Sequence, residues 1–274
     1  MHQNDYLEAY QKRALRACQL KQLSILVEID RICRKHHIDY WLESGTLLGA
    51  VRHGGFIPWD DDIDVGMMLP EVERFKAVAP AELPETMVLQ TPETMPEAKE
   101  PIIKVRDLDS FFVEPGDRFT NNYPKGLFVD IFPFVGYPNI PRSFCGRLVR
   151  TLCRSRAILH KPHPYGLRAV AEFFWFGAKY AACSAVWHAA CLLTSRKKYA
   201  SIIPMNNGYG TTHLRSSILP LSSVEFEGRT FSAPGDIDTF LRDLYGDYMQ
   251  IPPPEKRKIH AIFMVERLSE NSKK

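Results

Sequence analysis

Acidic residues crowd into one short stretch of this 274-residue chain. Residues 60–64 read Asp-Asp-Asp-Ile-Asp, so that Asp62 and Asp64 are separated by one apolar residue. If the stretch is a strand, its side chains alternate between two faces, and Asp62 and Asp64 point the same way. Two adjacent carboxylates repel each other unless a cation lies between them, and an oxygen-only ligand set suits a hard divalent ion. The sequence therefore predicts a site for Mg²⁺, or for Mn²⁺ in its place.

A third carboxylate lies inside an apolar segment further along the chain. Asp130 is the one charged residue after Gly126 in the segment 126–134, GLFVDIFPF. Burying a lone carboxylate among apolar residues is costly unless something positive binds it. We therefore expect Asp130 to join Asp62 and Asp64 as metal ligand and catalytic residue. The alternative is a buried acid that pairs with an arginine.

Groups suited to bind phosphate lie on both sides of the acids in the sequence. Ser44-Gly45-Thr46 precedes an apolar helical turn, which is typical of a helix N-cap, and the amides at a helix start favour an anion. Lys104 and Arg106 alternate with apolar residues, so they should share one face of a strand. The alternative to phosphate binding is that this face is simply solvated. The residues expected to bind substrate phosphates are Gly45, Thr46, Arg52, Lys104 and Arg106.

The elements that must position these residues follow from the apolar pattern. Segments with helical spacing predict helices at 5–36, 70–83, 236–245 and after Lys258. Segments with alternating or continuous apolar residues predict strands at 40–42, 87–91, 101–107, 110–114 and 126–134. The stretch 225–235 predicts a hairpin with its turn at Glu227-Gly228, and Asp236 and Gly246 are expected to begin and end the helix that follows.

The middle of the chain has a composition of its own. Between residues 131 and 224 there are twelve Lys and Arg and a single acid, Glu172. Residues 169–193 are apolar and aromatic, but Glu172, Lys179 and His188 interrupt them, and charges are expensive inside a membrane-spanning helix. We expect helices that attach to an anionic membrane surface or an acidic glycan, or a buried helical hairpin with a solvated basic face. The basic residues follow no nucleic-acid-binding motif, so nucleic acid is not an expected partner.

The cysteines and the N-terminus bear on the compartment. The six cysteines form no CxxC pair, and the first residues are polar and charged. These features are typical of reduced thiols in a cytosolic protein without a secretory signal. We therefore expect a cytoplasmic protein, peripheral at the inner face of the membrane if the middle segment binds lipid.

Several segments together resemble the LicD family. They are SGTLLGAVRHGGFIPWDDDIDVG, GLFVDIFPF, and FEGRTFSAP with LYGDYM and PPPEKR. The family includes bacterial phosphorylcholine transferases and is related to the fukutin-related proteins. The resemblance implies an α+β, nucleotidyltransferase-like fold, in which helices flank a mixed β-sheet. We expect a catalytic core at 1–140, a basic and apolar helical insert at 141–224, and a C-terminal segment at 225–274 that completes the site.

The resemblance also implies a reaction. Family members are similar to enzymes that pass a phospho-alcohol group from a CDP-activated donor to a sugar hydroxyl. We expect CDP-choline, or another CDP-alcohol, as the donor. The expected acceptor is a cell-surface glycan such as lipopolysaccharide, or its lipid-linked precursor. A choline group would prefer aromatic faces, and the candidates are Trp41, Trp59, Phe111, Phe112 and Tyr123.

Two alternatives to this reaction stay open. One is a transferase that moves the nucleotide itself onto a small molecule. The other is a non-catalytic glycan- or membrane-binding module that keeps the acids as a structural cation site.

Overall fold

The computed structural model describes residues 3–98, 103–117, 123–161 and 166–268. Pro101 and Ile102 of the predicted strand 101–107 therefore lie outside the described residues. The chain divides into two compact units, the first made of 1–132, 221–233 and 247–274, the second of 133–220 and 234–246. The three functional segments expected from the sequence stay a prediction.

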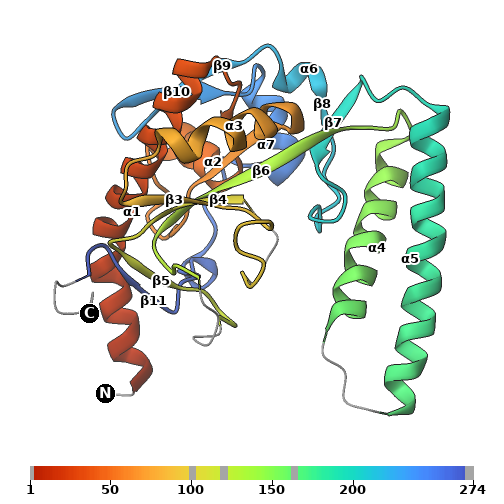
Figure 1. The fold of residues 1–274 in the computed structure, drawn as a ribbon, viewed down its shortest axis with the longest axis horizontal. Helices are drawn as coiled ribbons and strands as arrows, with labels where there is room; N and C mark the ends of the chain where they lie inside the picture. The colour runs from red at the N-terminus through yellow and green to blue at the C-terminus, as the bar shows by residue number, and fades with distance from the viewer. Residues whose placement is uncertain (1–2, 99–102, 118–122, 162–165, 269–274) are drawn as a thin grey trace. The chain divides into compact units, whose positions relative to one another are not determined.

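The first unit is built around a sheet with the strand order β1-β2-β6-β4-β3 (Figure 1). Its strands are β1 (Trp41–Leu42), β2 (Asp64–Met68), β3 (Met87–Gln90), β4 (Ile103–Asp107) and the first half of β6 (Phe128–Tyr137). The register of the antiparallel pair β4 and β6 places Lys104 opposite Asp130. With helices beside a mixed sheet, the predicted α+β, nucleotidyltransferase-like class is confirmed.

Three helices of the first unit match the predicted helical spacing. They are α1 (Gln3–His36), α2 (Ser44–His53) and α3 (Leu69–Glu82). No Pro or Gly interrupts α1, and its residues Ile25, Leu26 and Ile29 are fully buried. The apolar stripe of this helix is therefore core, as its 3.6-residue period predicts.

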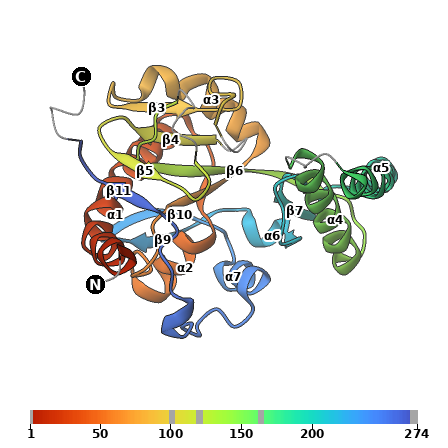
Figure 2. The same cartoon turned by 90° about the horizontal axis from the view of Figure 1, so that it is seen from below.

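The predicted C-terminal helix is wrong. After a short 3-10 turn, Pro254–Lys256, the described chain forms the strand β11 (Phe263–Val265), which pairs antiparallel with β5 (Phe111–Val113). Figures 1 and 2 both show β11 alongside α1, where Tyr10 stacks on Phe263 with ring centroids 5.2 Å apart. Met264 is fully buried between its neighbours. Tertiary pairing decides this segment, since local propensity in a short apolar run does not distinguish strand from helix.

The predicted hairpin and the helix after it are confirmed. Strands β9 (Ser222–Phe226) and β10 (Arg229–Ala233) meet at Glu227-Gly228, whose φ angles are both positive, 53° and 70°. Such a two-residue turn matches the twist of the flanking strands. In the second unit, α7 (Ile237–Tyr245) starts where the Asp236 side chain accepts a hydrogen bond from Thr239 N at 3.0 Å.

The second unit holds the middle segment of the chain. Its elements are α4 (Arg142–His160), α5 (Leu167–Leu193), β7 (Tyr199–Ile202), β8 (His213–Leu214), α6 (Arg215–Ile218), α7 and the second half of β6. Helices α4 and α5 run side by side as a hairpin in both views (Figures 1 and 2). Tyr137, Cys145 and Val149 form its small core, with Trp187 packed edge-on against Tyr137. Among the described helices, none is both long and apolar enough to cross a membrane.

The packing of β2 against β1 gives a test of the fold. Gly66 lies opposite Trp41 in the register, and a Cβ at Gly66 would overlap the buried indole ring. We expect Gly66→Ala to lower the free energy of unfolding by about 1–3 kcal/mol, as overpacked cores do. Urea unfolding measures this change. The matched control is Gly177→Ala in α5, where a Cβ meets open space, and which should be neutral or stabilising by up to about 1 kcal/mol. Equal effects of the two substitutions would contradict the packing.

Candidate active site

The acidic stretch lies where the chain enters β2. The strand begins at Asp64, so the prediction that Asp62 already lies in it is wrong by two residues. The predicted alternation is confirmed, because Ile63 and Val65 are fully buried while Asp62 and Asp64 are half-buried. The backbone N–H of Asp130 donates to the carbonyl of Ile63 at 2.8 Å. This bond brings β6 next to the residue between the two acids.

The carboxylates influence one another strongly. Burial raises the pKa of Asp62 well above its ordinary value, and the charges of Asp60 and Asp61 raise it further. Burial likewise raises the pKa of Asp64, helped by the charges of Asp62 and Asp130. Like charges held close together in a partly buried place cannot all stay ionised at little cost. The cluster must therefore hold protons or attract a cation.

Asp130 already has one positive neighbour. Lys104 Nζ lies 3.0 Å from Asp130 Oδ1 and 3.6 Å from a carboxylate oxygen of Glu114. Burial raises the pKa of Asp130, and the Lys104 ammonium opposes that rise. The sequence left open that Asp130 pairs with an arginine. Its ion-pair partner in the structure is Lys104. Lys104 Nζ also lies 3.4 Å from the centroid of the Phe128 ring, within the range of a cation–π contact.

The idea that Lys104 and Arg106 form a solvated strand face is wrong. The two side chains are only 4% and 3% exposed. Arg106 Nε donates to Gln90 Oε1 at 2.5 Å, and its Nη1 donates to the Gly126 carbonyl at 2.9 Å. Arg106 is thus engaged within the sheet, and only Lys104 of this pair touches a predicted catalytic acid.

Arg52 contributes to the C-terminal part of the first unit. Its Nη1 donates to the carbonyls of Tyr248 and Gln250, at 2.9 and 3.1 Å. Burial raises the pKa of Asp60 to about 6, and the charge of Arg52 is among those that oppose this rise. Phosphate binding by Arg52 stays a prediction.

The start of α2 differs from the predicted N-cap. The helix begins at Ser44, and the residue before it, Glu43, makes no side-chain cap hydrogen bond. Thr46 instead accepts a hydrogen bond from the backbone N–H of Asp64 at 2.8 Å, through Oγ1. A Cβ at Gly45 would lie 2.6 Å from Asp60 Oδ2, so only glycine lets this carboxylate approach the backbone. Gly45 and Thr46 therefore position the acids; phosphate binding by their amides stays a prediction.

A second group of ligand atoms lies beside the predicted one. Within the described residues, Asp60, Asp61 and His260 offer three such atoms within 4.8 Å of one another, and Asp62, Asp64 and Asp130 do not form such a group. Asp61 is buried, accepts from the backbone N–H of Ala261, and lies 3.2 Å from His260 Nδ1. This bond raises the pKa of His260 to about 9.

The contact between Asp61 and His260, together with the hydrogen bond from the Ala261 N–H to Asp61, anchors residues 260–261 to the acidic stretch. Sequence reasoning missed this contact, although the unbroken run of aspartates and a histidine three residues after the PPPEKR segment were the available signals.

Glu43 is another residue that sequence reasoning missed. It is fully buried, and Trp41 Nε1 donates to its Oε2 at 3.0 Å. Burial raises the pKa of Glu43 to about 8, so the folded chain holds this carboxyl protonated at neutral pH. Its backbone N–H donates to the Asp64 carbonyl at 3.0 Å, which places it directly beside the acids. An acid directly after the apolar residues Tyr40, Trp41 and Leu42 was the signal for it.

Comparison with known proteins identifies the family of the segment that holds these residues. Residues 37–142 match the family described as LicD/FKTN/FKRP, nucleotidyltransferase domain. All eight residues predicted for catalysis or substrate binding fall inside that range. This segment is a LicD-family domain. The resemblance on which the fold and the site were predicted is thereby confirmed.

Curated relatives extend the LicD likeness beyond the domain. The lipopolysaccharide cholinephosphotransferase LicD of Haemophilus influenzae is 29% identical over 264 residues, which are 92% of this chain and 97% of that protein. The human ribitol 5-phosphate transferase FKRP is 51% identical over 45 residues, which are 16% of this chain and 9% of FKRP. An uncharacterised protein of Rickettsia typhi is 44% identical over 70 residues, 26% of this chain and 21% of that protein.

Glu43 gives a pH-dependent test of the LicD-family site. Its folded pKa of about 8 lies above the ordinary value of 4.5. Between these values the unfolded chain has released a proton that the folded chain keeps, so the free energy of unfolding falls as the pH rises. We expect Glu43→Gln to flatten this fall between pH 5 and pH 8 in metal-free protein, measured by urea unfolding at a series of pH values. The exposed Glu225→Gln is the control, and an unchanged slope in Glu43→Gln would contradict the assignment.

Proposed function

We propose that this chain transfers a phospho-alcohol group, phosphocholine first, from a CDP-activated donor to a sugar hydroxyl of a cell-surface glycan. The observation that carries the proposal is the crowding of four aspartates, Asp61 buried and the other three partly buried, where the chain enters β2, inside a LicD-family domain. The long match to a lipopolysaccharide cholinephosphotransferase supports the choline group and the glycan acceptor. The short match to a ribitol 5-phosphate transferase supports the broader class of phospho-alcohol transfer.

The residues fit a divalent cation. Asp62, Asp64 and Asp130 offer oxygen atoms alone, which Mg²⁺ prefers and Mn²⁺ accepts. Asp130 Oδ1 is buried and lacks a hydrogen-bond donor in good geometry, although Lys104 lies close to it. We propose that these three acids hold the ion. When bound, it neutralises charge on the donor pyrophosphate and on the leaving CMP.

The chain's own groups then position the acceptor. Phosphoryl transfer demands positioning and charge stabilisation more than covalent chemistry. We place the acceptor hydroxyl at Asp130, whose raised pKa makes it a better proton acceptor than an exposed aspartate. Lys104, next to Asp130, keeps that carboxylate ionised and offers ammonium protons to phosphate oxygens. The amides of Gly45 and Thr46 complete the contacts with the donor.

The two arginines have a smaller part than Lys104. Two donor groups of Arg106 are engaged within the sheet, and Arg52 holds the carbonyls of Tyr248 and Gln250. We assign to Arg106 and Arg52 the role of positive charges near the donor, rather than direct ligands of its phosphates.

Two of the aromatic candidates suit a choline group. Trp41 and Phe112 are buried and serve as core. Trp59 and Tyr123 are only partly buried, and each already has a cation over its ring: Arg257 lies 4.9 Å from the Trp59 centroid and Lys125 lies 3.7 Å from that of Tyr123. A ring face that attracts a side-chain cation can attract a quaternary ammonium as well. We therefore favour Trp59 and Tyr123.

The site of action follows from this reaction. A cytoplasmic protein, peripheral at the inner face of the membrane, would meet both a CDP-alcohol and a lipid-linked glycan precursor. This localisation is part of the proposal.

The reaction is tested by release of CMP. We expect turnover with CDP-choline and Mg²⁺ in the presence of a lipopolysaccharide acceptor, and loss of turnover when EDTA is added. Asp62→Asn, Asp64→Asn and Asp130→Asn should each lower the rate by about a hundredfold to a thousandfold or more, because each removes a carboxylate proposed to hold the ion that offsets negative charge in the transition state. The exposed Asp39→Asn is the matched control and should keep full activity.

The same assay separates the alternatives. CDP-ribitol as the preferred donor would keep the reaction class and change the alcohol. Release of pyrophosphate from a nucleoside triphosphate would support nucleotide transfer instead. Full activity in all three aspartate variants would contradict the proposed site.

A further inference from the structure

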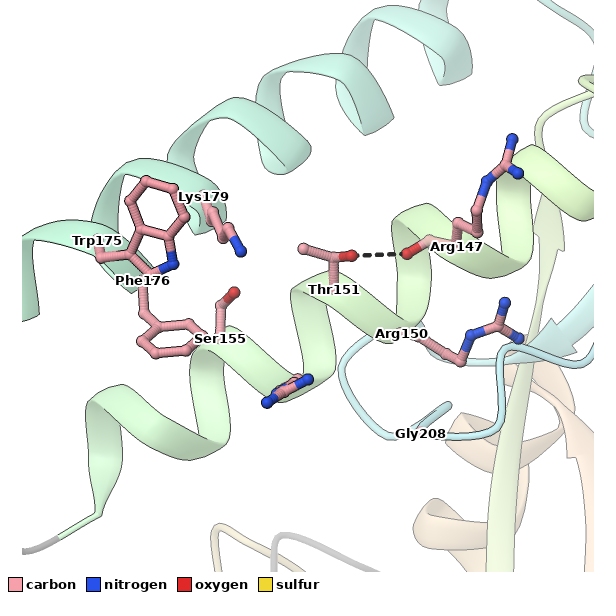
Figure 3. A pocket seen from close by; sticks show the side chains of 9 residues that line it. Arg147, Arg150, Thr151, Ser155, Trp175, Phe176, Lys179 and Gly208 are labelled. Carbon is pink, nitrogen blue, oxygen red and sulfur yellow. Dashed lines mark hydrogen bonds between the residues drawn. The ribbon is translucent and has the colours of Figure 1, made fainter. Parts of the chain in front are cut away.

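An open pocket of about 570 Å³, which the transfer reaction does not use, lies between α4 and α5. Its cationic side chains are Arg147, Arg150 and Arg154 from α4 and Lys179 from α5, and none of its lining residues is acidic. Figure 3 shows the cavity between the two helices, with Trp175 and Phe176 at one end and Arg147 and Arg150 at the other.

The sequence of α4 builds one wall of this cavity. Arg147, Arg150 and Arg154 recur at three and four residues, so they share one face of the helix. Like charges at this spacing destabilise a helix. Within the described residues, no ion pair involves Arg147, Arg154 or Lys179. This row of arginines on α4 is therefore suited to bind an anion.

A buried hydroxyl points to a ligand independently of the charges. Ser155 is 1% exposed, and its Oγ has no hydrogen-bond partner. In Figure 3 this hydroxyl points into the space between α4 and α5, near Lys179. An unsatisfied buried hydroxyl costs free energy comparable to a lost hydrogen bond. An oxygen-bearing ligand would satisfy it.

The wall from α5 continues as an exposed apolar surface. Trp175 is 61% exposed, and Lys179 Nζ lies 4.6 Å from the centroid of its ring. No residue of α5 is buried. Its exposed large apolar side chains are Leu167, Val170, Phe173, Phe174, Trp175, Val186, Leu192 and Leu193. An exposed apolar surface of this extent, next to a row of cations, is typical of a helix that lies in the interface of a bilayer.

We propose that the α4–α5 hairpin binds the surface of an anionic phospholipid bilayer. The cavity takes a lipid phosphate, to which the arginine forks and Lys179 donate hydrogen bonds together with the Ser155 hydroxyl. Phe173, Phe174 and Trp175 insert among the acyl chains. Charge complementarity selects a bilayer over a second copy of this chain, because two such hairpins would bring arginines against arginines. The interrupting charges Glu172 and Lys179 keep α5 on the surface.

Flotation of the full chain with lipid vesicles tests this surface. One set of vesicles contains phosphatidylcholine alone, and the other contains equal parts of phosphatidylcholine and phosphatidylglycerol. We expect binding to the second set, weakened by added salt. At about 1 kcal/mol for each cation near an anionic surface, Arg147→Gln with Arg154→Gln should weaken it by about thirtyfold. The control, Arg13→Gln with Arg229→Gln, removes equal charge from exposed positions of the first unit and should keep binding.

A second variant tests the apolar part of the same surface. Phe173→Ser with Phe174→Ser changes two exposed side chains and should reduce vesicle binding while leaving the far-ultraviolet circular dichroism unchanged. The assay contains EDTA and no donor, so its outcome is independent of the transfer reaction.

Four outcomes would overturn the proposal. They are equal binding to both sets of vesicles, equal loss in the control variant, binding of an acidic glycan without binding of vesicles, and self-association that buries the aromatic residues. Inhibition of vesicle binding by inorganic phosphate would support the cavity as the headgroup site.

Discussion

The main electrostatic constraint on the first unit is the repulsion among the carboxylates near the start of β2. Burial raises the pKa of Asp62 and of Asp64, and the negative charges of Asp60 and Asp130 raise both further. Protons or a cation must offset this repulsion in the folded protein. Because ionising all of these carboxylates is costly without a nearby cation, the cluster favours binding of a divalent ion. In the proposed reaction, that ion would offset the negative charge of the donor phosphates.

The surrounding elements maintain this arrangement through short polar contacts. Thr46 holds the backbone of Asp64, the missing side chain of Gly45 makes room for Asp60, and the register of β4 and β6 places Lys104 opposite Asp130. Lys104 lies beside Asp130 and offsets the negative charge of its buried carboxylate. Lys104 Nζ lies 3.0 Å from Asp130 Oδ1, and within the described part of the chain Asp62, Asp64 and Asp130 do not form a tight group of ligand atoms.

Sequence reasoning found the acids because the alternation of buried apolar and half-buried acidic residues begins at Asp62 and Ile63, before the strand, and continues into it at Asp64 and Val65. It failed where tertiary contacts decide. The segment around Met264 became a strand through pairing with β5, and the burial of Lys104 depends on the ring of Phe128. Helix α7 was predictable to the residue, since its cap and its terminating glycine are local features. The ion pair between Asp61 and His260 joins residues 199 positions apart, and no local pattern contains it.

The location of a bound ion tests the central claim most directly. A crystal structure with Mn²⁺ and a non-hydrolysable donor analogue would locate the metal by its anomalous scattering. The account predicts a peak bonded to Asp62 and Asp64, with the Asp130 carboxylate turned from Lys104 toward the metal. A peak held by Asp60 and Asp61 with a neutral His260, and with Asp130 still bound to Lys104, would contradict it.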